Sequence, residues 1–161
     1  MNWPRPIRVV GIGRPLGDDA LAWEVVRQLQ QKEWPPDIVF YPLEGGQRLL
    51  EILDGRGSLI LIDALAPAGG PGVIRRFGWP DPCVEVLRAG STHHLRPAEV
   101  LGLAVTLGLL PARVAIWAIE GESFDPLTGL GPNVVAAIPD LVRRIGGELE
   151  VNIKMGSDAH A

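Results

Sequence analysis

Short, nearly all-apolar runs of strand-forming residues alternate along this chain with stretches that have the period of a helix. The first run, Ile7 to Ile12 (IRVVGI), is typical of a strand covered on both faces, and from Asp18 onward apolar residues recur on one side of a helix. Strands that alternate with helices form mainly parallel sheets with helices on both faces. The pattern therefore predicts a three-layer α/β/α sandwich with a twisted, mainly parallel sheet of about five strands.

The same periodicities place the other elements. Prolines and glycines in 66–82 argue against a continuous helix or strand there, and Pro139 predicts a kink or a break in the last helix. Residues 1–150 are predicted to form a single domain, followed by a flexible tail at 151–161. Strands are expected at 37–43, 58–65 and 113–119, with an edge strand at 83–87; helices are expected from 18 to the prolines at 35 and 36, at 46–55, at 97–108 with Val100, Ala104 and Leu107 inward, and at 132–145.

Composition narrows the class of partner. The chain has 161 residues, of which 47% are hydrophobic, enough for one sizeable core. Its net charge of -4 leaves no basic face, so neither nucleic acid nor an anionic membrane is expected as a partner. Cys83 is the single cysteine and is interpreted as a small buried apolar residue. Because MNWPRPIRVV lacks a signal core and no apolar run approaches the roughly 20 residues of a membrane helix, we expect a cytoplasmic protein.

The segment GIGRPLGDDA, residues 11–20, lies between the first strand and the first helix. A dinucleotide loop of the form G-x-G-x-x-G would need glycine at Leu16, and the carboxylates of Asp18 and Asp19 stand where phosphates would bind. Asp18 is expected to cap the helix that follows. Asp19 either interacts with the positive end of that helix or serves a site.

Further polar residues follow the predicted strands. Because the carboxyl ends of parallel strands share one edge of the sheet, several of these side chains are expected to meet in a cleft. Two carboxylates and an imidazole from separate loops would make a three-ligand site for a divalent first-row metal. Asp63 ends an apolar strand, so it either caps a turn or faces that cleft. The candidates are Asp19, Glu44, Asp63, His93, His94, Glu120 and Glu122.

Four segments match, in order, the motifs of one known family. They are VVGIGRPLGDDA, LIDALAPAGGPGVI, STHHLRPAEVLGLAVTLGLLPARVAIWAIEGESF and GLGPNVVAAIPDLVRRI. The first resembles an opening G-x-G-N-x-L-x-x-D-[DE], and the second a strand-end D-A followed by a glycine-rich P-G segment. The third resembles an S-x-H-x-L helix with an I-E-x-E-S-F loop, and the fourth a closing helix. Nearly end to end, the chain resembles the hydrogenase maturation endopeptidases, which process the large subunit of nickel-iron hydrogenases.

This resemblance implies an activity and a set of residues. The family removes a C-terminal extension from the large-subunit precursor once nickel has been inserted. Asp19, Asp63 and His93 match its metal-binding set, which engages nickel supplied by the precursor, and no organic cofactor is implied. Arg14 stands where the family usually has asparagine, and Glu44 stands where it has aspartate.

The resemblance leaves two mechanisms and two rival functions open. The metal would act as a Lewis acid or lower the pKa of a bound water, or a carboxylate among the three would act as general base. The stretch from Ala66 to Pro82 and the loop from Gly121 to Gly131 are the candidate substrate-contacting walls. One rival is a chaperone-like protein that binds the metal-loaded precursor without cutting it. The other is an unrelated α/β hydrolase or nucleotide-binding domain on the same scaffold.

Overall fold

A computed structural model describes residues 2–81, 97–123, 125 and 127–158. In these residues five strands form one sheet in the order β2-β1-β3-β5-β4. All neighbouring strands pair in parallel except β4, which runs antiparallel to β5. The strands are β1 (Ile7–Gly13), β2 (Ile38–Glu44), β3 (Ser58–Leu65), β4 (Ile74–Gly78) and β5 (Arg113–Glu120).

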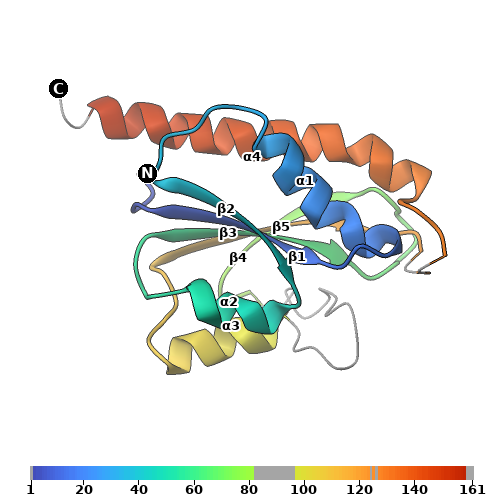
Figure 1. The fold of residues 1–161 in the computed structure, drawn as a ribbon, viewed down its shortest axis with the longest axis horizontal. Coiled ribbons are helices and arrows are strands. Elements are labelled where there is room, and N and C mark those ends of the chain that lie inside the picture. The colour runs from blue at the N-terminus through green and yellow to red at the C-terminus, as the bar shows by residue number, and fades with distance from the viewer. Residues whose placement is uncertain (1, 82–96, 124, 126, 159–161) are drawn as a thin grey trace.

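Helices cover both faces of this sheet. Figure 1 shows α1 and α4 on one face, and α2 and α3 on the other. The predicted three-layer sandwich with a mainly parallel sheet is thereby confirmed. The helices are η1 (Gly17–Ala20) and η2 (Gly46–Arg48), both of the 3-10 type, and α1 (Leu21–Leu29), α2 (Leu49–Ile52), α3 (Pro97–Thr106) and α4 (Pro132–Asp158).

The central strand β3 divides its side chains between two hydrophobic cores. All eight of its residues are buried. Because side chains alternate along a strand, Ile60 and Ile62 enter the core under α1 and α4, whereas Leu61 and Leu65 enter the core under α2 and α3. Asp63 lies two residues from both Leu61 and Leu65, so its side chain lies on the same face as theirs, the α2 and α3 face.

Residues 151–158, which belong to the predicted flexible tail at 151–161, instead continue helix α4. Helix α4 is 27 residues long and continues through Pro139 to Asp158, so Pro139 does not break the helix, and the alternative of a kink stays a prediction. The buried face of α4 continues at helical spacing through Leu149 to Asn152, which is 3% exposed. Asn152 accepts a hydrogen bond of 3.0 Å from the backbone N–H of Trp3, which anchors the end of α4 to the start of the chain.

Two further differences from the predictions have local causes. The stretch 66–82 contains strand β4, because Ile74 to Phe77 is free of the prolines and glycines on either side and its backbone pairs with β5. The side chain of Leu107, predicted to face inward, is 56% exposed because α3 ends at Thr106. The edge strand predicted at 83–87 lies outside the described residues.

Candidate active site

Asp19 and Asp63 lie at the carboxyl edge of the sheet. Each is 4% exposed. Asp19 lies on η1, directly after β1, and Asp63 lies near the end of β3, which pairs with β1. Residues of η1 and β3 come within 8 Å of each other, Cα to Cα. The fold therefore brings the two elements that carry these aspartates together at the edge where α/β proteins bind ligands, at the start of α1 in Figure 1.

The turn that carries Asp19 is tight. A Cβ atom on Gly13 would lie 2.0 Å from the backbone oxygen of Asp19, so no larger residue fits there. The N–H of Arg14 donates to that same oxygen at 3.1 Å, and Gly17 adopts a φ of 53°, which favours glycine. The Arg14 guanidinium lies 3.5 Å from the Asp19 carboxylate. The glycines of the opening segment thus form the turn that fixes Asp19, with Arg14 as a nearby positive charge.

Asp18 does not cap a helix, which corrects the prediction. It lies inside η1, whose capping position is Leu16, and it is fully buried. Its carboxylate accepts hydrogen bonds from the backbone N–H groups of Glu122, Ser123 and Gly131, at 2.6, 2.8 and 2.7 Å. Local capping preferences could not predict these partners, because they are distant in the sequence. Asp18 therefore connects η1 to the loop between β5 and α4.

Asp63 lies near the end of β3 and Glu120 ends the neighbouring strand β5, and both side chains are on the same face of the sheet. Leu65 is the register partner of Glu120, and Asp63 is that of Ala118, so both carboxylates lie on the α2 and α3 face. The Asp63 carboxylate accepts a hydrogen bond of 2.7 Å from the N–H of Ala64. Glu120 is 3% exposed. The edge of the sheet thus buries a second strand-end carboxylate, which the sequence singled out only as one of several candidates.

The Glu120 carboxylate holds the loop after β3. It accepts a hydrogen bond from the N–H of Ala68, and a Cβ atom on Gly70 would lie 2.8 Å from its second oxygen. The backbone of Glu120 bonds the same loop through Gly72 and Val73, at 2.8 and 2.9 Å. Glycine at position 70 leaves room for the loop backbone to pass closely beside this buried carboxylate.

Of the remaining candidates, Glu44 and Glu122 lie among the described residues, and the two histidines do not. The side chain of Glu44 is exposed at the end of β2. Glu122 accepts a hydrogen bond of 2.7 Å from the N–H of Asn133, in the first turn of α4, so it has a capping role. His93, His94 and Cys83 lie outside the described residues. In the part of the chain that the structure describes, no group of three or more His, Cys, Asp or Glu side chains is arranged to hold a metal ion.

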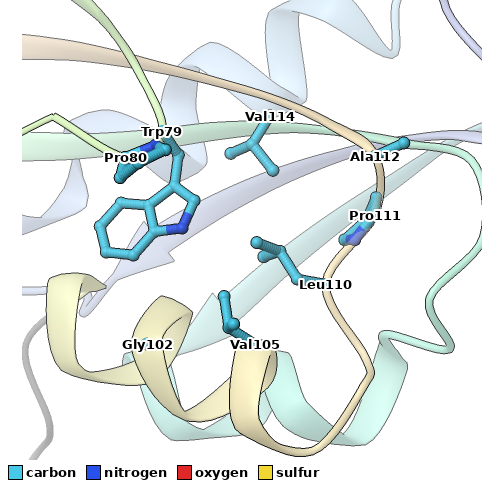
Figure 2. A pocket seen from close by; sticks show the side chains of 8 residues that line it. All are labelled: Trp79, Pro80, Gly102, Val105, Leu110, Pro111, Ala112 and Val114. Atoms are coloured by element: carbon cyan, nitrogen blue, oxygen red, sulfur yellow. The ribbon is translucent and has the colours of Figure 1, made fainter.

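A pocket of about 490 Å³ lies at the other end of the sheet (Figure 2). Its lining includes Trp79 after β4, Val105 on α3, and Leu110 and Val114 around the start of β5. Among the described residues, none of those that line this pocket has a titratable side chain. The carboxylates and this apolar pocket therefore occupy opposite edges of the sheet.

Comparison with known proteins shows to which family the chain belongs. The model of the hydrogenase maturation protease family matches residues 23–148. The chain belongs to the hydrogenase maturation protease family. The resemblance of the four sequence segments is thereby confirmed, and so is the class of activity, a protease.

Relatives in this family cover most of the chain. The hydrogenase 2 maturation protease of Escherichia coli (strain K12) is 29% identical over 144 residues, which are 86% of this chain and 87% of that protein. The solved structure of the hydrogenase maturating endopeptidase HybD from E. coli, 29% identical, superposes with a TM-score of 0.70 over 90% of each chain. The [NiFe] hydrogenase maturation protease HybD from Thermococcus kodakarensis, 21% identical, shares the fold with a TM-score of 0.68 over 92% of this chain and 99% of that one.

The helices of this maturation protease do not have the length and composition of membrane spans in the part of the chain that the structure describes. Although α4 has 27 residues, it carries charged side chains along its length. Among the described residues, no helix is both long and apolar enough to cross a membrane.

Proposed function

We propose that this protein removes the C-terminal extension of a nickel-iron hydrogenase large-subunit precursor after nickel insertion. In this proposal Asp19, Asp63 and His93 contact the nickel that the precursor carries. The metal is part of the substrate, and its presence in the precursor marks that subunit as ready for cleavage.

One observation carries the proposal: two buried carboxylates from separate elements lie at the ligand-binding edge of a maturation protease fold. Asp19 and Asp63 are 4% exposed, and burying a carboxylate is costly unless an opposite charge or hydrogen bonds compensate. The Arg14 guanidinium, 3.5 Å from Asp19, is one such charge, and the N–H of Ala64 donates to Asp63; a divalent cation brought by the substrate would add a second positive charge at this edge. Carboxylate oxygen and imidazole nitrogen are donors that nickel accepts.

Peptide hydrolysis sets what these groups must do. The oxygen of a water molecule bonds to the scissile carbonyl carbon, a base accepts the proton from that water, and the C–N bond breaks as its nitrogen takes up a proton. Two routes fit this sequence: the precursor's nickel polarises the carbonyl or the water, or one aspartate accepts the proton. A variant that binds the precursor without cleaving it marks a base, whereas a variant that loses binding marks a ligand.

The test uses a purified nickel-loaded precursor, with the nickel-free precursor as control. The native protein is expected to shorten only the loaded form, as measured by mass spectrometry. Asp19→Asn, Asp63→Asn and His93→Ala should each lower the cleavage rate by at least about a hundredfold. Asp140→Asn, on the outer surface of α4, is the matched control and should cleave at the native rate.

Two outcomes would contradict the proposal. Stable association of the native protein with the loaded precursor, with no shortening, would favour the chaperone-like function. Full activity in any of the three site variants would remove that residue from the site.

A further inference from the structure

The loop between β5 and α4 is closed at both ends by the carboxylate of Asp18. One oxygen of Asp18 accepts hydrogen bonds from the N–H groups of Glu122 and Ser123, and the other accepts one from Gly131. The backbone N–H of Asp18 in turn donates to the carbonyl of Ser123 at 3.0 Å. Both ends of the loop are thus held against η1, the element that carries Asp19, at Glu122 and Ser123 on one side and at Gly131 on the other.

A second carboxylate strengthens this closure. Glu122 accepts a hydrogen bond from the N–H of Asn133, and a Cβ atom on Gly131 would lie 2.5 Å from the Glu122 carboxylate. The end of the loop is therefore fixed both to η1 and to the first turn of α4. Little freedom remains at the two ends of the loop, because each is held by charge-assisted hydrogen bonds.

The described tip of the loop is ordered by its own hydrogen bonds. Asp125 accepts from the N–H of Leu127 at 2.9 Å and from that of Thr128 at 3.2 Å. This turn presents the side chain of Leu127, which is 93% exposed. The loop whose ends Asp18 and Glu122 hold therefore carries an apolar side chain that lies almost wholly in solvent, where a partner docked at this edge can reach it.

We propose that Asp18 is a positioning residue that fixes this loop beside Asp19, and that Leu127 contacts the hydrogenase precursor. The inference rests on the proposed function, because the precursor is the partner that the site receives. Leu127 is the apolar group that the precursor covers when it binds. Asp18 touches neither substrate nor metal, and it acts through the placement of Leu127.

The experiment measures KM and kcat for cleavage of the nickel-loaded precursor, together with the Kd of the complex. Leu127→Ala should raise KM and Kd about tenfold and change kcat less than about twofold, since an exposed side chain is lost and no reacting group moves. Leu107→Ala is the matched control, because it makes the same change at an exposed leucine after α3. This variant should leave KM and Kd unchanged.

Asp18→Asn tests the positioning role. An amide has one acceptor oxygen, so it cannot accept from the N–H groups at both ends of the loop. We expect KM to rise about tenfold, and we expect Leu127→Ala to add little in the Asp18→Asn background, because a misplaced Leu127 no longer contributes. A role in folding alone would instead lower the apparent kcat in proportion to the folded fraction and leave KM unchanged.

A second variant tests the loop without removing a buried charge. Gly131→Ala forces the Glu122 carboxylate to move and should raise KM a few-fold, even where Asp18→Asn does not fold. An unchanged KM and Kd in Leu127→Ala, or additive effects of Asp18→Asn and Leu127→Ala, would overturn the inference. If the native protein binds the precursor without cleaving it, the proposed function fails while the Kd values still decide the inference.

Discussion

The two edges of the sheet bury different kinds of polar group. Among the described residues, the carboxyl edge buries four carboxylates, whereas the amino edge buries the neutral side chains Ser58 and Asn152. A buried charge costs far more than a buried neutral group unless it is compensated. The amino edge is thus built for stability, and the carboxyl edge keeps costly groups that a site needs. The four carboxylates are Asp18, Asp19, Asp63 and Glu120.

At the amino edge, short hydrogen bonds between uncharged groups join the start of β3 to the segment before β1. The hydroxyl of Ser58 donates to the carbonyl of Pro4 at 2.7 Å, and its backbone N–H donates to that of Pro6 at 2.9 Å. Gly57 makes this possible, because its φ is 75° and a Cβ atom there would lie 2.0 Å from the Pro6 oxygen. Stability at this edge therefore depends on one close approach of two backbones.

The largest expected effect on stability comes from a substitution at Gly57, where the two backbones lie close together. Gly57→Ala should lower the free energy of unfolding by about 3 kcal/mol or more, because it adds a backbone clash to an unfavourable φ. Urea unfolding followed by circular dichroism measures the change. The folded fraction should still cleave the precursor at the native rate, since the carboxyl edge is untouched.

Gly147→Ala on α4 is the control for that substitution. No atom lies within 4 Å of a Cβ added there, so alanine should stabilise the helix by roughly 0.5 to 1 kcal/mol. Equal stabilities of the Gly57→Ala and Gly147→Ala variants would show that the stability of the fold does not depend on the close backbone contact at Gly57.

The opposite result is expected at the carboxyl edge. Asp63→Asn keeps an oxygen that accepts from the N–H of Ala64 and removes a buried negative charge near Glu120. Its free energy of unfolding should stay within about 1 kcal/mol of the native value or rise, while cleavage is lost. The urea midpoint and the cleavage rate are measured on the same preparation. A large loss of stability would mean that Asp63 serves the fold and would weaken the contrast between the edges.

The sequence predicted most of the fold because its periodicities are local. Strand-type runs and helical spacing placed β1, β2, β3, β5 and the helices, and the two strand-following aspartates came from the same alternation. The role of Asp18 could not be predicted, because its partners lie 104 to 113 residues away. Strand β4 was missed because proline and glycine around it hid a short run that only pairing with β5 stabilises. The part of His93 in the site stays a prediction, since it lies outside the described residues.

The smallest expected effect concerns a carboxylate at neither edge, Glu24 on the solvent side of α1. Hydrogen bonds from Arg27 and Gln28, at 2.9 and 2.8 Å, lower the pKa of Glu24 from 4.5 to about 2. A pKa that is lower in the folded state stabilises the fold above the unfolded value of 4.5, and this contribution is lost as the pH falls from 4.5 toward 2. Because the pair is solvent-screened, Glu24→Gln should cost only about 0.5 kcal/mol at pH 7.

The measurement for Glu24 is the difference in free energy of unfolding between the native protein and Glu24→Gln, followed from pH 7 to pH 2. The difference should be constant above about pH 5, shrink below it and vanish near pH 2, and added salt should reduce it at pH 7. The cleavage rate of the variant should be native, because this carboxylate lies outside the site. A difference of several kcal/mol would show that an exposed ion pair contributes as much as the closed amino edge, and the assignment of stability to that edge would then be wrong.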